Sequence, residues 1–120
     1  MQQIENLDAW RVTEPEIMEM DRYLSGANAP DVEEDVRLCI ASGARDMILD
    51  CAQLGYLTGA GARLFLNAAR MMKDVGGALR VGNLSGQPRD LFMACGLDVF
   101  VPVEEDVAVA RVPDKAFAAQ

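Results

Sequence analysis

The fold is decided by residues 47–75, which read MILDCAQLGYLTGAGARLFLNAARMMKDV. The opening apolar run is typical of a strand that is buried on both faces, and it ends at Asp50. A loop follows, and the tetrapeptide TGAG at 58–61 leads into an apolar helix that we expect from about Gly61 to Val75. This order places free backbone N–H groups at the carboxyl edge of a sheet, where α/β folds usually bind ligands or partners.

The flanking sequence alternates between helix and strand patterns. Asn28 is a good N-cap for a helix that ends at Gly43, with Pro30 tolerated in its first turn and Asp31 able to close a capping box. The remaining expected elements are the central strand 46–51, a strand at 78–81, a helix from Ser85 to about Cys95, a strand at Val99–Val101 and a weak helix at Val103–Val112. This alternation predicts a mostly parallel sheet with right-handed crossovers.

The N-terminal region has the weaker pattern of two edge strands. They are expected at Ala9–Thr13 and Ile17–Tyr23, joined by a hairpin turn at 14–16 that contains Pro15. The predicted fold class is therefore α/β: a single domain over residues 1–112 with a small, mostly parallel sheet, an N-terminal hairpin and about four flanking helices. Residues 113–120 are expected to form a frayed tail.

Length and charge restrict the function. A chain of 120 residues is one domain of ordinary size, and its hydrophobic fraction of 51% supports a core. No apolar run approaches the ~20 residues of a membrane span and no signal peptide is visible, so we expect a cytoplasmic protein without membrane insertion. The net charge of −8 argues against nucleic acid as a partner, because phosphate backbones require clustered basic residues.

The side chain that most often serves as a general base is missing. The sequence has no His and only three dispersed cysteines, which argues against a zinc site and excludes Ser-His and Cys-His nucleophilic arrangements. Cys51, at the end of the central strand, is the one thiol that we would test for reactivity. A dinucleotide motif is incomplete, because Leu64 stands where the third glycine is required after Gly59 and Gly61. We therefore expect no metal, cofactor or catalytic residue, and a small enzyme is the least favoured class.

Several spaced features resemble one known family. In chain order they are Asn28-Ala29-Pro30, Leu49-Asp50, Tyr56-Leu57, Gly61, Gly76-Gly77, Ser85 with Arg89, and Gly96-Leu97. Together they resemble the STAS domain of bacterial anti-sigma factor antagonists, over about Tyr23 to Val112. The resemblance implies a partner-switching role: such domains bind an anti-sigma factor that is also a GHKL-type serine kinase. The kinase phosphorylates a Ser or Thr at the start of the second helix, and a PP2C-like phosphatase reverses this.

The sequence departs from the family at the phosphorylated loop. Family members commonly read Asp-Ser-x-Gly where this chain reads Thr58-Gly59-Ala60-Gly61, so the resemblance places Gly59 at the phosphoacceptor position. Either Thr58 is a shifted phosphoacceptor or the switch is absent. We favour Thr58 as an N-cap contributing about 1 kcal/mol, and we expect Gly59 to need a positive φ or a close backbone approach. Ser25 stands at a position that is often acidic in the family.

Two functions of different kinds follow from the resemblance. The first is a non-enzymatic binding module that docks the kinase or anti-sigma factor through Ser25, Asn28, Thr58, Gly59, Ala60, Gly61 and Arg63. The alternative is an unphosphorylated STAS subunit of a larger assembly, such as a stressosome-like scaffold or a lipid-transport ABC complex, and a homo-oligomer stays open. The wide apolar surface of the helix after Gly61 favours this alternative, because such a helix must be covered by its own sheet or by another molecule.

Overall fold

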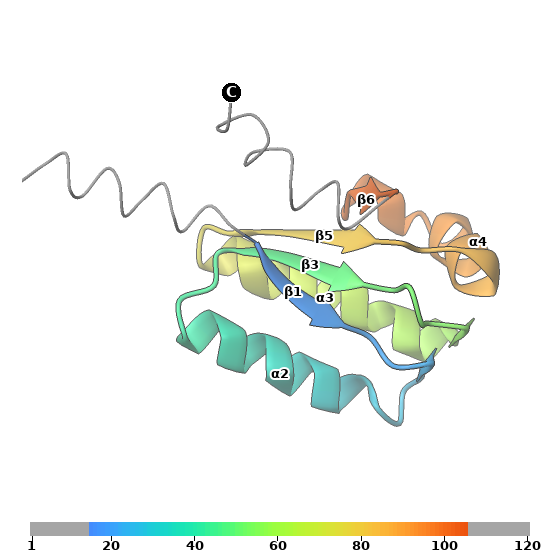
Figure 1. Ribbon diagram of the computed structural model, residues 1–120, viewed down its shortest axis with the longest axis horizontal. Coiled ribbons are helices and arrows are strands. Elements are labelled where there is room, and N and C mark those ends of the chain that lie inside the picture. The colour runs from blue at the N-terminus through green and yellow to red at the C-terminus, as the bar shows by residue number, and fades with distance from the viewer. Residues whose placement is uncertain (1–14, 106–120) are drawn as a thin grey trace, which may run out of the picture.

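The computed structural model describes residues 15–105 of the chain, and a four-stranded parallel sheet forms its centre (Figure 1). The strands are β1 (Glu16–Glu19), β3 (Asp46–Asp50), β5 (Ala78–Gly82) and β6 (Val103–Glu104), in the spatial order β1-β3-β5-β6. Because each pair is parallel, each connection must cross over, and a helix lies in each of the three crossovers. The predicted mostly parallel α/β sheet is confirmed.

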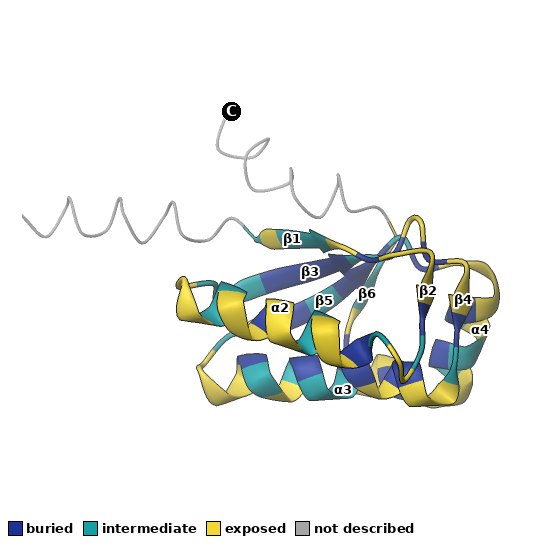
Figure 2. Ribbon diagram, turned by 90° about the horizontal axis from the view of Figure 1, so that it is seen from below, coloured by how far each residue is buried: buried dark blue, intermediate teal, exposed yellow. Residues whose placement is uncertain are grey.

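The helices occupy one layer beneath this sheet and its carboxyl end. Helices α2 (Ala29–Ala41) and α3 (Gly59–Asp74) lie on the same side of the sheet, and α4 (Gly86–Ala94) lies beyond the ends of the strands (Figure 2). A second, two-stranded parallel sheet pairs β2 (Tyr23–Leu24) with β4 (Tyr56–Leu57). Among the described residues, no helix combines the length and the apolar character that crossing a bilayer requires.

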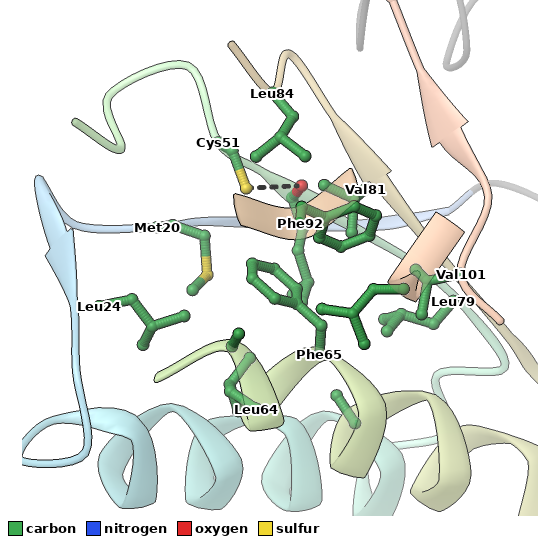
Figure 3. Packing of buried hydrophobic residues seen from close by; sticks show 14 of the residues in the cluster. Met20, Leu24, Cys51, Leu64, Phe65, Leu79, Val81, Leu84, Phe92 and Val101 are labelled. Atoms are coloured by element: carbon green, nitrogen blue, oxygen red, sulfur yellow. Dashed lines mark hydrogen bonds between the residues drawn. The ribbon is translucent and has the colours of Figure 1, made fainter. Parts of the chain in front are cut away.

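The core explains the continuous apolar run of β3. Met47 and Leu49 join the cluster on the helix side of the sheet, while Ile48 belongs to the opposite face because side chains alternate along a strand. All three side chains are fully buried. Phe65 of α3 meets Phe92 of α4 edge to face, with ring centroids 5.3 Å apart, so α4 is joined to the main core (Figure 3).

The N-terminal region differs from the prediction. The expected strand Ile17–Tyr23 is divided into β1 and β2, and Glu16 belongs to β1 rather than to a turn. The division occurs after Met20, whose N–H makes a last ladder bond to the carbonyl of Asp50 at 2.9 Å before the chain bends away. Strand β1 pairs in parallel with β3. The expected partner strand Ala9–Thr13 lies outside the described residues, so the hairpin stays a prediction.

The expected strand at Val99–Val101 is wrong. A 3₁₀ helix, η1 (Leu97–Val99), is followed by a turn, and the last strand, β6, begins at Val103. The strand was predicted because all three residues are apolar. However, Val99 and Phe100 are 78% and 65% exposed, and only Val101 is buried. The expected helix Val103–Val112 is also wrong at its start, because Val103 and Glu104 form β6. The rest of that helix, residues 106–112, and the expected tail 113–120 lie outside the described residues.

Candidate functional site

Helix α3 begins at a side-chain cap. Thr58 has an extended backbone (φ −98°, ψ 163°), and its Oγ1 accepts a hydrogen bond from the N–H of Gly61 at 2.9 Å. The carbonyl of Thr58 accepts the first intrahelical bond, from the N–H of Ala62 at 2.8 Å. Thr58 is therefore the N-cap that the sequence predicted, and the helix begins at Gly59, two residues earlier than expected.

The two glycines that follow have different structural roles. Gly59 is exposed, its φ is not positive, and a Cβ added there would meet nothing within 4 Å. The expectation that Gly59 needs a positive φ or a close backbone approach is therefore wrong. Gly61 is the glycine that the packing requires, because an added Cβ would lie 2.6 Å from the carbonyl carbon of Leu24 and 2.8 Å from the nitrogen of Ser25.

The loop between β2 and α2 lies against this helix start. Asn28 joins the two ends of that loop, since its Oδ1 accepts from the N–H of Ser25 at 2.8 Å and its Nδ2 donates to the carbonyl of Tyr23 at 3.0 Å. Asn28 is the N-cap residue of α2, as predicted, and its carbonyl accepts from the N–H of Val32 at 3.3 Å. Its side chain does not cap the helix, so the expected capping box with Asp31 is wrong. Within the loop, the Ser25 hydroxyl accepts from the N–H of Ala27 at 3.2 Å.

A glutamine from α4 fixes the residue before the cap. The N–H of Leu57 donates to Gln87 Oε1, and Gln87 Nε2 donates to the carbonyl of Leu57, both at 2.8 Å. The side-chain amide thus pairs with β4 as a neighbouring strand would. Sequence reasoning missed Gln87, because its partner lies 30 residues away and no local pattern indicates the contact.

Two tyrosines beside the loop were also missed. Tyr23 and Tyr56 are register partners in the β2–β4 pair, and they are 54% and 57% exposed, whereas their neighbours Leu24 and Leu57 are buried. In a strand of two residues, the alternation of exposed and buried side chains is too short to be recognised in the sequence. Exposed aromatic side chains of this kind are enriched where proteins contact one another.

The predicted site residues therefore gather in one place, with unequal access. Gly59, Ala60 and Arg63 are exposed, Ser25, Asn28 and Thr58 are half-buried, and Gly61 is buried. We call this the α3-start surface: the loop Ser25–Asn28, the segment Thr58–Ala60, Arg63, and the pair Tyr23 and Tyr56. It offers main-chain groups and small side chains flanked by two aromatic rings.

The comparisons with known proteins agree with this architecture. Residues 8–110 match the profile of the family described as STAS domain. The chain belongs to the STAS domain family.

Relatives of this STAS domain include proteins of sigma-factor regulation. BtrV of Bordetella bronchiseptica, a candidate anti-sigma factor antagonist by name, is 30% identical over 80 residues, which cover 67% of this chain and 69% of BtrV. The crystal structure of TM1081 from Thermotoga maritima has a TM-score of 0.69 at 14% identity, covering 78% of this chain and 83% of that chain. The phosphorylated form of SpoIIAA from Bacillus has a TM-score of 0.59 at 21% identity, covering 80% and 88%.

Asp50 and Cys51, at the carboxyl end of β3 in this STAS domain, are hydrogen-bonded and buried, respectively. Asp50 Oδ1 accepts from the N–H of Ala52 at 3.0 Å and from Asn83 Nδ2 at 3.1 Å. Burial, with a smaller contribution from the charge of Asp50, raises the pKa of the Cys51 thiol to about 12 (Figure 3). Cys51 is therefore a protonated core residue at neutral pH, and Cys95 is the exposed cysteine. Among residues 15–105, no three His, Cys, Asp or Glu side chains lie together as metal ligands would.

Proposed function

We propose that this STAS domain is a non-enzymatic binding module that docks an anti-sigma factor of the GHKL kinase type through the α3-start surface. The observation that carries the proposal is that this surface is exposed and rigidly supported. The backbone contact at Gly61 and the paired hydrogen bonds of Gln87 hold it from two sides. A preorganised surface binds with less loss of conformational freedom, which favours affinity. The name of the relative BtrV supports the same kind of partner.

The structure of the loop supports a docking site without the usual switch. The SpoIIAA structures include a phosphorylated and an unphosphorylated form, so a STAS domain of similar fold carries a phosphate. Here Gly59, at the position that the sequence resemblance implies for the phosphoacceptor, has no hydroxyl. The Thr58 hydroxyl is half-buried and engaged with the N–H of Gly61. We therefore propose that docking is constitutive, and that neither the kinase nor a PP2C-like phosphatase regulates it by modification.

The open space around Gly59 allows a direct test. Gly59→Ser adds a hydroxyl where an added Cβ meets nothing within 4 Å, so the substitution should leave the fold intact. The full chain and this variant are each mixed with the GHKL-type anti-sigma factor of the same organism and ATP, and phosphate is read by mass spectrometry. We expect the natural chain to bind without modification, and the Ser variant to acquire one phosphate and dissociate. Phosphorylation of the natural chain at Thr58 would contradict constitutive docking.

The alternative function is an unphosphorylated subunit of a larger assembly. One argument for it, the wide apolar surface expected on α3, does not hold. The apolar side chains of α3, including Leu64, Phe65 and Ala68, are buried within the same chain by the sheet and the neighbouring helices. Val99 and Phe100 are neighbouring exposed apolar side chains among the described residues, and they still favour self-assembly. Light scattering of the purified chain separates the two functions, because a scaffold subunit must form a defined oligomer and a docking module is expected as a monomer.

A further inference from the structure

A groove lies beside the free part of the β5 edge, away from the α3-start surface. It has a volume of about 780 Å³ and runs between the C-terminal half of α3 and the segment after η1. Its walls include Leu66, Ala69 and Lys73 on one side and Phe100 and Pro102 on the other. Ligand sites typically have volumes of roughly 300–1,000 Å³, so the groove is large enough for a short peptide segment.

The floor of the groove is a strand edge that β6 leaves open. Strands β5 and β6 pair only at Val81↔Val103 and Gly82↔Glu104 within the described residues. The carbonyl of Pro102 accepts from the N–H of Val81 at 2.9 Å, but proline has no N–H to donate to the carbonyl of Leu79, the next acceptor in this register. Because alternate residues of a parallel strand bond to opposite neighbours, the backbone of Leu79 faces this open edge.

The charge of the groove is opposite to that of the whole chain. Arg70 and Lys73 are exposed on its α3 wall, and neither forms an ion pair within residues 15–105. Arg80 also lines the groove but is paired with Asp46 at 3.1 Å, and Asp74 is the single carboxylate of the lining. In a chain with a net charge of −8, this local cationic excess selects for an anionic ligand.

We propose that this groove binds an extended, acidic peptide segment of another protein. The segment adds as a short strand to the open edge of β5, with its backbone bonded to Leu79. Its carboxylates lie near Arg70 and Lys73, and its apolar side chains contact Phe100. This site is separate from the α3-start surface, so the proposal does not depend on the anti-sigma factor partner.

The test uses the full chain labelled with ¹⁵N and two capped hexapeptides, in which valine alternates with glutamate or with lysine. We expect the glutamate peptide to shift the amide signals of Lys73, Leu79 and Phe100, and to bind at least about tenfold more tightly than the lysine peptide. Methylating the peptide nitrogen that bonds to the Leu79 carbonyl should abolish most of this binding. A double charge reversal, Arg70→Glu with Lys73→Glu, should reverse the preference, whereas Arg37→Glu on the exposed face of α2 should not.

Three results would overturn the proposal. The first is no shift of the groove amides with the glutamate peptide, or shifts confined to another surface. The second is equal affinity for the two peptides. The third is a groove already filled, seen as nuclear Overhauser contacts from residues 106–120 to Leu79 or Phe100, or as peptide-independent shifts that grow with protein concentration because a second copy binds there.

Discussion

The same substitution at two nearby glycines of α3 should have opposite effects on stability. At Gly61, an added Cβ would lie 2.6 Å and 2.8 Å from main-chain atoms of Leu24 and Ser25, whereas carbon atoms pack at about 3.5–4.0 Å. The obstacle is backbone that is also fixed by the bond from the N–H of Thr58 to the carbonyl of Leu24 at 3.0 Å. It cannot move without weakening the β2–β4 pair. We therefore expect Gly61→Ala to cost about 3 kcal/mol, at the upper end for overpacking.

At Gly59 the added methyl group meets nothing within 4 Å, and the backbone is already helical. Gly59→Ala should therefore stabilise the fold by about 0.4–1 kcal/mol, mainly by restricting the unfolded chain. Urea unfolding followed by circular dichroism gives both free energies by linear extrapolation. The reasoning would be refuted if Gly61→Ala stayed within about 0.5 kcal/mol of the natural chain, or if Gly59→Ala were equally destabilising.

Thr58, Gln87 and Cys51 give four further predictions. Thr58→Ala removes the helix cap and should lower the free energy of unfolding by about 1 kcal/mol, whereas Thr58→Ser should keep most of it in the same urea assay. Gln87→Ala leaves the N–H and the carbonyl of Leu57 without this partner, so the free energy of unfolding should fall by roughly 1–3 kcal/mol. An unchanged rate of hydrogen exchange at the Leu57 amide would count against this prediction. Because burial raises the pKa of Cys51 from 9.0 to about 12, iodoacetamide at neutral pH should label Cys95 and spare Cys51, and comparable labelling in a peptide map would contradict this. The raised pKa also stabilises the fold fully below about pH 9, and this contribution should be lost as the pH rises toward about 12 in unfolding measurements.

The parts of the fold that depend on local pattern were predictable. The continuous apolar run before Asp50 predicted a buried central strand, and the cap at Thr58 was read from its residue type and position. The prediction failed at Val99–Val101, because apolar residues can also cover a 3₁₀ turn and remain exposed there. Burial depends on what packs against a segment, and a sequence pattern does not contain that information.

The sequence predicted where the candidate site residues lie, but it did not predict the contacts that hold them in place. The order of strand, loop and helix placed the site at the start of α3. However, the close backbone approach that was expected at Gly59 occurs at Gly61, since only the packing of Leu24 against α3 decides which of the two must be a glycine. The contact between Gln87 and Leu57 joins elements that become neighbours only after folding. Such long-range contacts follow from the tertiary structure and leave no local signal.

The central claim is that the α3-start surface binds the anti-sigma factor. Its most direct test is a titration calorimetry measurement with that factor, comparing the natural chain with Gly59→Glu and with Gly59→Ala as the uncharged control. A carboxylate in the first turn of a helix favours folding by about 0.3–1 kcal/mol, so lost binding could not be attributed to unfolding. We predict that Gly59→Glu weakens binding by at least about tenfold while Gly59→Ala binds like the natural chain. Equal affinity of Gly59→Glu and the natural chain would contradict the docking surface proposed here.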